Sequence, residues 1–385
     1  MFTSINTGYI SSGSKLKKTT NLGINWSTIL DCGSQGIERI KFFDDNLGFV
    51  FNRTKVFKTN NGGQNWFEYN LPDSMYNHYM LDSSTGFGSY LGRINSNYGK
   101  IYKTTNGGQN WIELGSDLNL HLVTDLLFFD SSEGIALGEK YLPLTRHIYK
   151  TTNGGLNWQA IQFSTNAKKM YLDNDILYLL DVNRLCKSSN QGETWKTIFV
   201  SDSIPVINSI DIINNHIFLC GYHYYLVSPP YYGIKYKIYI SSDGGNIWNL
   251  SYNTGASNAI NSINFINELT GFAGGSYLLK TTTGGTTFIS TINTAVPDKH
   301  TLSQNYPNPF NPTTRIKFDV ASNSKIKLVV YNTLGKEMTV LVNENMNAGS
   351  YETEWNAESF SSGIYYYSLF INNNLIDTKK TVLIK

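Results

Sequence analysis

The chain has 385 residues, a formal net charge of +2 and 14% aromatic residues. This near-neutral balance, without any long basic run, excludes the electrostatic surface that nucleic acids or anionic membranes require, so neither is expected as a partner. No apolar stretch approaches the roughly 20 residues of a membrane-spanning helix, and we predict no membrane span. The length allows two or three domains, and abundant tyrosine with only nine prolines favours a β-rich protein.

The first segment, MFTSINTGYISSG at residues 1–13, is polar and shows no secretory signal. It resembles the inside of a later segment, FINELTGFAGG at residues 265–275. We therefore expect the chain as given to start part-way through a repeating unit whose innermost strand is incomplete.

A nine-residue box then recurs seven times. Its copies, which carry Asn-Gly or a related pair in the middle and end in an aromatic residue, are KTTNLGINW (18–26), KTNNGGQNW (58–66), KTTNGGQNW (103–111), KTTNGGLNW (150–158), KSSNQGETW (187–195), ISSDGGNIW (240–248) and KTTTGGTTF (280–288). Successive copies lie 37 to 53 residues apart, and six of the seven tryptophans occupy the last box position. Seven copies predict seven structural units.

Each box predicts a tight β-hairpin turn, because glycine and asparagine tolerate the positive φ that such a turn needs. An Asn or Asp side chain can also accept hydrogen bonds from backbone N–H groups of its own turn. The residues in that position are Asn61, Asn106, Asn153, Asn190 and Asp243. The aromatic ring that ends the box begins the next strand and can pack between neighbouring sheets.

Four short strand-like segments make up each unit, most clearly INSINF, FAGGS, YLLKTTT and TFIST between residues 260 and 291. A period near 40 residues with four strands per unit is typical of a β-propeller. We predict an all-β fold: a seven-bladed β-propeller over residues 1–292 with an incomplete first blade, followed by a small Ig-like antiparallel β-sandwich.

The box resembles the Asp-box, or BNR, repeat of sialidases, sortilin-type receptors, two-propeller xyloglucanases and propellers of the photosystem II assembly-factor type, and the last group most of all. The resemblance covers residues 1 to about 292 and implies the fold rather than an activity. In these families the box lies on the face away from the ligand. The resemblance therefore implies structural roles for Asn61, Trp66, Asn106, Trp111, Asn153, Trp158, Asp243 and Trp248.

After the last box, residues 293–301, around Pro297, predict a linker. Clean alternation from residue 302 to residue 385 predicts a compact antiparallel sandwich. This region closely resembles the type A C-terminal sorting domain of the bacterial type IX secretion system, through QNYPNPFNP (304–312), VYNTLGKE (330–337) and GSYETEWNAESFSSGIYYYSL (349–369). The residues of its sorting motif are Asn305, Tyr306, Pro307, Asn308, Pro309 and Phe310.

The resemblance implies export by the type IX machinery in a bacterium of the Bacteroidetes type, usually followed by removal of the tail. The machinery is therefore an expected partner of the C-terminal region. The expected final location is extracellular or on the outer-membrane surface.

No motif for a nucleophile, a phosphate loop or a metal site occurs in the chain, so we name no catalytic residue and expect neither a cofactor nor a metal. The six histidines are interpreted as hydrogen-bonded or exposed side chains. Cys32, Cys186 and Cys220 are interpreted as small buried side chains, with a disulfide between Cys186 and Cys220 as the alternative.

Two classes of hydrolase also carry such boxes. The sialidase resemblance requires three arginines around a carboxylate, and the propeller offers Arg39, Arg53, Arg93, Arg146 and Arg184 without the surrounding motif. A xyloglucanase requires two propellers and opposed carboxylates. The acidic residues nearest to that role are Glu38, Asp73, Asp117 and Asp202, which we interpret as solvated.

Three connections between second and third strands are expanded: residues 89–100, 138–147 and 221–237. They are expected on the face opposite the boxes, where tyrosines beside a stiff proline pair offer large contact area at low entropic cost. The ligand-binding candidates are Tyr222, His223, Tyr224, Tyr225, Tyr231, Tyr232, Arg93 and Arg146. The alternative is that these tyrosines are strand residues facing a neighbouring blade.

The sequence thus favours a secreted or surface-attached, non-catalytic binding propeller that recognises an extracellular protein or glycan. The alternative is a polysaccharide-active glycoside hydrolase of the xyloglucanase or sialidase type.

Overall fold

The computed structural model describes residues 1–90, 99–114, 122–140, 145–161, 163, 166–167, 169–200, 206–228, 231–253, 259–276, 278–285, 289–293 and 297–385. These residues form 34 β-strands, and none of them lies in a helix. The part of the chain that is described therefore holds no helix that could cross a membrane. The chain divides into two compact units, Met1–Asp202 and Ser203–Lys385.

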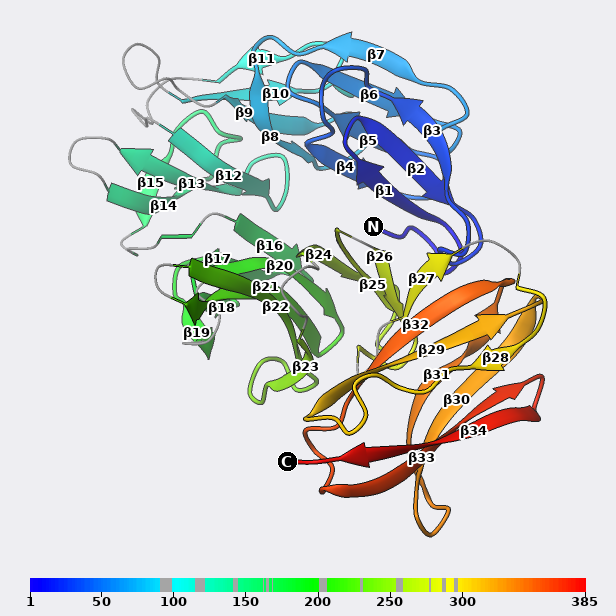
Figure 1. The fold of residues 1–385 in the computed structure, drawn as a ribbon. Helices are drawn as coiled ribbons and strands as arrows, with labels where there is room; N and C mark the ends of the chain where they lie inside the picture. Colours follow the sequence, from blue (N-terminus) through cyan, green and yellow to red (C-terminus); the bar gives the residue numbers. More distant parts are fainter. Residues whose placement is uncertain are drawn as a thin grey trace. The chain divides into compact units, whose positions relative to one another are not determined.

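The first unit consists of five antiparallel sheets that follow one another in chain order (Figure 1). The first sheet has three strands: β1 (Gly8–Ser12), β2 (Lys15–Thr19) and β3 (Ser27–Asp31). The second contains β4 (Arg39–Phe42), β5 (Gly48–Phe51), β6 (Lys55–Thr59) and β7 (Phe67–Asn70), and the third β8 (Met75–Met80), β9 (Gly86–Tyr90), β10 (Lys100–Thr104) and β11 (Ile112–Glu113). The fourth contains β12 (Leu122–Phe128), β13 (Gly134–Lys140), β14 (Thr145–Thr151) and β15 (Gln159–Ile161), and the fifth β16 (Lys169–Asp173), β17 (Ile176–Asp181), β18 (Arg184–Ser188) and β19 (Lys196–Val200).

The second unit begins with two more sheets of the same kind. One contains β20 (Val206–Ile213), β21 (His216–Ser228), β22 (Tyr231–Ser241) and β23 (Asn249–Asn253), and the other β24 (Ile260–Phe265), β25 (Gly271–Gly275), β26 (Leu278–Thr281) and β27 (Ile289–Asn293). We call these seven sheets the repeat sheets. In each of the last six, the four strands pair in sequence order, so that every hairpin connects neighbouring strands.

The C-terminal region is a sandwich of two sheets. Its strands are β28 (Thr301–Leu302), β29 (Thr313–Val320), β30 (Ser324–Asn332), β31 (Glu337–Met346), β32 (Gly349–Asn356), β33 (Gly363–Ile371) and β34 (Asn374–Leu383). One sheet has the order β31-β30-β33-β34. The other, β32-β29-β28, is continuous with the last repeat sheet, because β32 pairs antiparallel with β27.

In the second to sixth repeat sheets, the box forms the turn between the third and fourth strands, and hydrogen bonds within the box close this turn. In the third box, the Thr104 hydroxyl accepts the N–H of Gly108 at 3.0 Å and donates to the Asn106 side chain at 3.0 Å. Asn106 Oδ1 in turn accepts the N–H of Asn110 at 3.0 Å. Gly107 and Gly108 have φ of 70° and 86°, which explains the glycine pair. The same bonds recur at Thr59 with Asn61, Thr151 with Asn153, Ser188 with Asn190 and Ser241 with Asp243.

The apolar cores lie between successive repeat sheets. Phe87 of β9 stacks on Phe128 of β12 with ring centroids 3.4 Å apart, and Trp158 meets Phe128 edge-on at 5.9 Å. Box lysines also cross between sheets, since Lys58 Nζ donates to the backbone oxygen of Ser83 at 3.0 Å. Cys32 is half-buried, Cys186 and Cys220 are buried, and no disulfide joins any two of them, so the alternative of a Cys186–Cys220 disulfide is wrong for this structure.

Candidate functional site

The segment predicted as the largest expanded loop is a long β-hairpin. Strand β21 has 13 residues and β22 has 11, and they pair continuously from Ile217 opposite Ser241 to Leu226 opposite Tyr232. The hairpin thus lengthens the second and third strands of its sheet instead of inserting an irregular loop between them. Pro229 and Pro230 and the side chain of Tyr231 lie outside the described residues.

One face of this hairpin is aromatic and uncharged. Residues directly opposite each other in an antiparallel pair share a face. The aromatic face is defined by the three pairs Tyr222 with Tyr236, Tyr224 with Ile234, and Leu226 with Tyr232. The ring centroids of Tyr222 and Tyr224 lie 5.6 Å apart, and contact with Tyr224 raises the pKa of Tyr222. Tyr224, Leu226 and Tyr232 are 54%, 55% and 67% exposed.

The opposite face is basic and locally packed. Lys235 Nζ lies 4.7 Å from the centre of the Tyr225 ring, which covers Gly233 so closely that a Cβ there would lie 2.5 Å from the ring. Burial and the nearby Lys237 and Lys235 lower the pKa of His223. Tyr225 and His223 therefore lie on the other side of the hairpin from Tyr222 and Tyr224, and the structure does not bring the sequence candidates together in one cluster.

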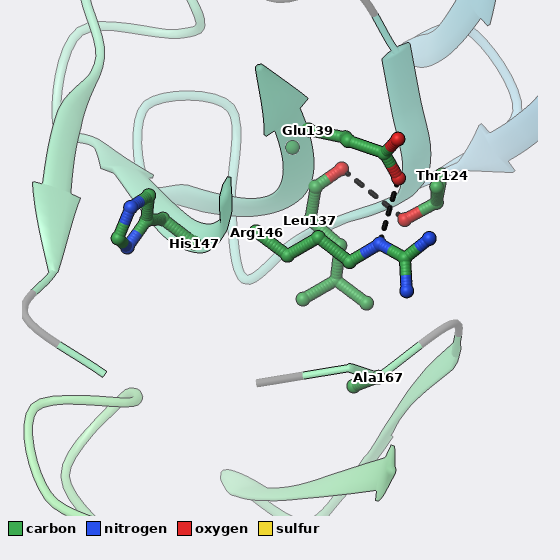
Figure 2. Close-up of a pocket in the computed structure, with 7 residues that line it drawn as sticks. Thr124, Leu137, Glu139, Arg146, His147 and Ala167 are labelled. Carbon is green, nitrogen blue, oxygen red and sulfur yellow. Dashed lines mark hydrogen bonds and ion pairs between the residues drawn. The ribbon is translucent and has the colours of Figure 1, made fainter. Parts of the chain in front are cut away.

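Arg146 lines a pocket formed by residues of the fourth repeat sheet and Ala167 (Figure 2). Its Nε donates to Glu139 Oε2 at 2.7 Å, and Nη1 donates to Asn166 Oδ1 at 3.5 Å. Thr124, Leu137, His147 and Ala167 are among the other lining residues. The guanidinium is thus already paired with a carboxylate, which reduces its capacity to bind an anionic ligand. Arg93, the other predicted arginine, lies outside the described residues.

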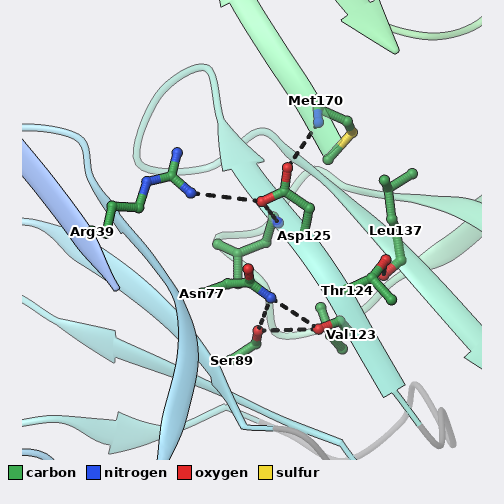
Figure 3. Close-up of polar contacts among 9 residues, drawn as sticks. Arg39, Asn77, Ser89, Val123, Thr124, Asp125, Leu137 and Met170 are labelled. Atoms are coloured by element: carbon green, nitrogen blue, oxygen red, sulfur yellow. Dashed lines mark hydrogen bonds and ion pairs between the residues drawn. The ribbon is translucent and has the colours of Figure 1, made fainter. Parts of the chain in front are cut away.

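A polar network ties the inner strands of three repeat sheets together (Figure 3). The buried Asp125 carboxylate of β12 accepts the backbone N–H of Met170, in β16, at 2.8 Å and lies 3.8 Å from Arg39 Nη1 of β4. Burial raises the pKa of Asp125, while Arg39 opposes that rise. Neither residue was predicted from the sequence to form an ion pair. The available signal was a charged residue inside the apolar stretch LVTDLLF.

A second link and a buried histidine adjoin this network. Asn77 Nδ2 donates to the backbone oxygen of Val123 and to Ser89 Oγ, both at 3.1 Å (Figure 3). His78 stacks on Phe51 with centroids 4.4 Å apart, and neither ring nitrogen has a hydrogen-bond partner among the described residues. The expectation that every histidine is hydrogen-bonded or exposed is therefore wrong for His78. Burial, helped by the Arg39 charge, lowers its pKa to about 3 and keeps it neutral.

The acidic candidates are engaged with neighbouring side chains. Glu38 accepts the Arg53 Nε at 2.8 Å, and Asp73 accepts the Tyr102 hydroxyl and lies 3.9 Å from Lys100 Nζ. Asp117 and Asp202 lie outside the described residues. Within the described ranges, no group of three or more His, Cys, Asp or Glu side chains is placed to hold a metal ion.

The predicted sorting motif forms an ordered corner of the C-terminal sandwich. Asn305 is buried and donates to the hydroxyls of Thr314 and Thr381, each at 2.8 Å. Its backbone N–H donates to the Tyr367 hydroxyl at 2.7 Å. Phe310 is buried in the sandwich core, whereas Tyr306 is 82% exposed. The Pro307 carbonyl accepts a hydrogen bond from the Asn305 side chain. The Asn308 side chain donates to the backbone oxygen of Lys380 and accepts the N–H of Val382, both in β34. Pro309 is the remaining residue of the motif.

Comparison with known proteins identifies the C-terminal region. Residues 304–385 match the family described as the secretion system C-terminal sorting domain. This match marks the protein for export by the type IX secretion system to the cell surface or the extracellular space, and it implies contact with that machinery. No curated protein matches the chain.

Solved structures define the fold of the repeat sheets. YCF48 bound to a D1 peptide is 19% identical with a TM-score of 0.53, over 73% of this chain and 90% of that chain. The GH74 xyloglucanase from Xanthomonas campestris is 10% identical with a TM-score of 0.53, over 83% of this chain and 59% of that chain. The extracellular domain of a hybrid two component system from B. thetaiotaomicron is 10% identical with a TM-score of 0.54, over 100% and 56% of the two chains.

These similarities show the fold alone. The chain is an all-β protein, a β-propeller followed by a sandwich-like sorting domain, as the sequence predicted. The number of seven blades, the incomplete first blade and the boundaries at residues 292 and 302 stay predictions.

Proposed function

We propose that this exported propeller is a non-catalytic binding protein, which recognises an extracellular protein or glycan through the aromatic face of the β21–β22 hairpin. The observation that carries the proposal is the exposure of that face, where Tyr224 and Tyr232 present 54% and 67% of their surfaces to solvent. Large amphipathic rings on paired strands lose little conformational freedom when they bind, and they supply much of the energy of recognition surfaces.

Two further observations support this proposal. The aromatic face carries no charged residue, which suits a neutral glycan or an uncharged stretch of polypeptide better than an anion. YCF48, whose fold is similar, was solved bound to a D1 peptide, so a propeller of this kind can serve peptide recognition.

A hydrolase would need two carboxylates free to act on one bond. Glu38 and Asp73 are instead engaged with Arg53 and with Tyr102 and Lys100.

The test is a binding screen of the full chain against glycans and bacterial surface proteins, run beside an assay for polysaccharide hydrolysis. Replacing Tyr224 and Tyr232 together with Ala should weaken binding of any ligand found by about 2 to 4 kcal/mol. Tyr225→Ala, on the opposite face, is the matched control and should leave the affinity unchanged. Turnover of a polysaccharide, or loss of affinity in the Tyr225 variant alone, would overturn the proposal.

A further inference from the structure

The outer strand of the last repeat sheet is not a free edge. Strand β27 pairs antiparallel with β32 of the sorting domain, with Ile289 opposite Thr353, Ser290 opposite Glu352 and Thr291 opposite Tyr351. Strand β32 also pairs with β29 on its other side, so one seven-stranded sheet runs from the propeller into the sorting domain (Figure 1). An unpaired edge strand exposes a row of backbone donors and acceptors, and here β32 satisfies them.

Side chains of the last repeat sheet and the sorting domain also pack together. Ile289, in the last strand of the propeller, is 6% exposed and belongs to the apolar core of the sorting domain, together with Phe318 and Tyr351. The contact between the two parts therefore includes a shared core residue as well as backbone hydrogen bonds.

An ion pair adds a specific electrostatic contact. In earlier boxes the first lysine reaches the following repeat sheet, as Lys58 does at Ser83 and Lys103 does at Ser131. The corresponding residue of the seventh box, Lys280, instead donates to the Glu344 carboxylate of β31. The two side chains are only 15% and 9% exposed, so replacing either one leaves a shielded charge without its partner.

A second acidic group faces the sixth repeat sheet. Tyr252 of β23 is buried, and the charge of Glu354 in β32 adds to the burial that raises the pKa of Tyr252. Arg315 Nε lies 3.5 Å from Glu354 Oε2. Tyr252 of the sixth repeat sheet is thus within electrostatic range of a carboxyl of the sorting domain.

We propose that the outer edge of the last repeat sheet is a binding site for a specific partner, the sorting domain of the same chain, and that this site holds the domain after the connecting chain has been cut. The site binds two features of the sorting domain at once: strand β32, which pairs antiparallel with β27, and the acidic side chain of Glu344, which pairs with Lys280. Cleavage between residues 294 and 299 would then leave a non-covalent complex, and release of the tail would require displacement of β32 from β27.

The experiment inserts a protease recognition sequence between residues 295 and 298 of the full chain, cleaves under native conditions and separates the products by size-exclusion chromatography. We expect the propeller and tail fragments to elute together. Lys280→Glu and Glu344→Lys, which each place like charges in contact, should each lower the affinity of the tail by at least roughly tenfold. The double reversal should restore co-elution.

The matched control reverses the exposed pair Lys327 and Glu337, which lies within the sorting domain and should not affect co-elution. Hydrogen exchange on the uncut chain gives a second measurement, because the β27 amides should be protected and should lose protection in Glu344→Lys. Separate elution of folded wild-type fragments would overturn the proposal. Unprotected β27 amides in the uncut chain would overturn it as well, whether or not the cut fragments remain folded.

Discussion

The Asp125 carboxylate accepts the backbone N–H of Met170 at 2.8 Å and lies 3.8 Å from the Arg39 guanidinium. A single side chain in the fourth repeat sheet therefore contacts the inner strands of the second and fifth. Such a carboxylate, buried in a low-dielectric site, is costly unless its acceptor capacity is used. Asp125 thus links the inner strands of three repeat sheets through one hydrogen bond and one ion pair.

Asp125→Asn should destabilise the protein by about 1 to 3 kcal/mol, because the amide cannot accept both the Met170 and the Leu126 N–H groups and no longer balances Arg39. Urea unfolding measures the change. The control is Glu68→Gln, which alters an exposed pair with Lys55 and should cost less than about 1 kcal/mol. Equal losses in the two variants would show that the Asp125 network contributes nothing beyond a surface pair.

The sequence was sufficient where the determinants are local. Each box contains its own turn glycines, its own acceptor side chain and its own aromatic residue, so the hairpins, the all-β class and the repeat could be predicted from nine-residue windows. The sorting domain was equally predictable, because its sequence from Gln304 onward is specific to that family.

Contacts that depend on register or on distant strands could not be predicted. Whether Tyr224 and Tyr225 share a face depends on which residues pair across the hairpin, and the alternation of a strand places them on opposite sides. Nothing local to Arg39 or Asp125 indicates that the two strands meet. The pairing of β27 with β32 likewise joins a repeat strand to a region with a different sequence pattern.

The box residues should contribute to stability in unequal amounts. Asn106→Ala removes the acceptor of the turn and should cost about 1 kcal/mol. Trp111→Ala should cost about 2 to 3 kcal/mol, less than a fully buried tryptophan, because its ring is half-buried against the core that contains Phe51 and Met75. Gln109→Ala, at an exposed position in the same box, is the control for both in thermal and urea unfolding. A loss at Gln109 as large as that at Asn106 would contradict the turn argument.

The two faces of the β21–β22 hairpin should differ in stability as well as in binding. Replacing Tyr224 and Tyr232 with Ser should change the free energy of unfolding by less than about 1 kcal/mol in total, because both rings are largely exposed. Tyr225→Ala removes the ring that covers Gly233 and faces Lys235, and should cost about 1 to 2 kcal/mol. Calorimetric melting of the full chain distinguishes the two sets. Unfolding caused by the Tyr224 and Tyr232 changes would instead identify those rings as core.

Glu354 should make the stability of the protein fall as the pH rises. Burial raises the pKa of this carboxyl from 4.5 to about 7, against the opposing charge of Arg315, and its Oε1 has no hydrogen-bond partner among the described residues. The native state therefore holds the proton at pH values where the unfolded chain has released it. Its contribution to stability is fully present below pH 4.5 and is lost progressively as the pH rises to about 7.

The loss across that window is on the order of 3 kcal/mol, from about 1.36 kcal/mol per pKa unit. Glu354→Gln carries no titrating group, so it should be more stable than the wild-type protein at pH 8 and nearly equal to it at pH 5, as measured by urea unfolding at both values. Glu337→Gln, at an exposed position in the same sandwich, is the control and should follow the wild-type dependence. If the Glu354→Gln variant and the wild type keep the same difference in unfolding free energy at both pH values, the carboxyl does not titrate in this window, and its burial must be compensated by Arg315.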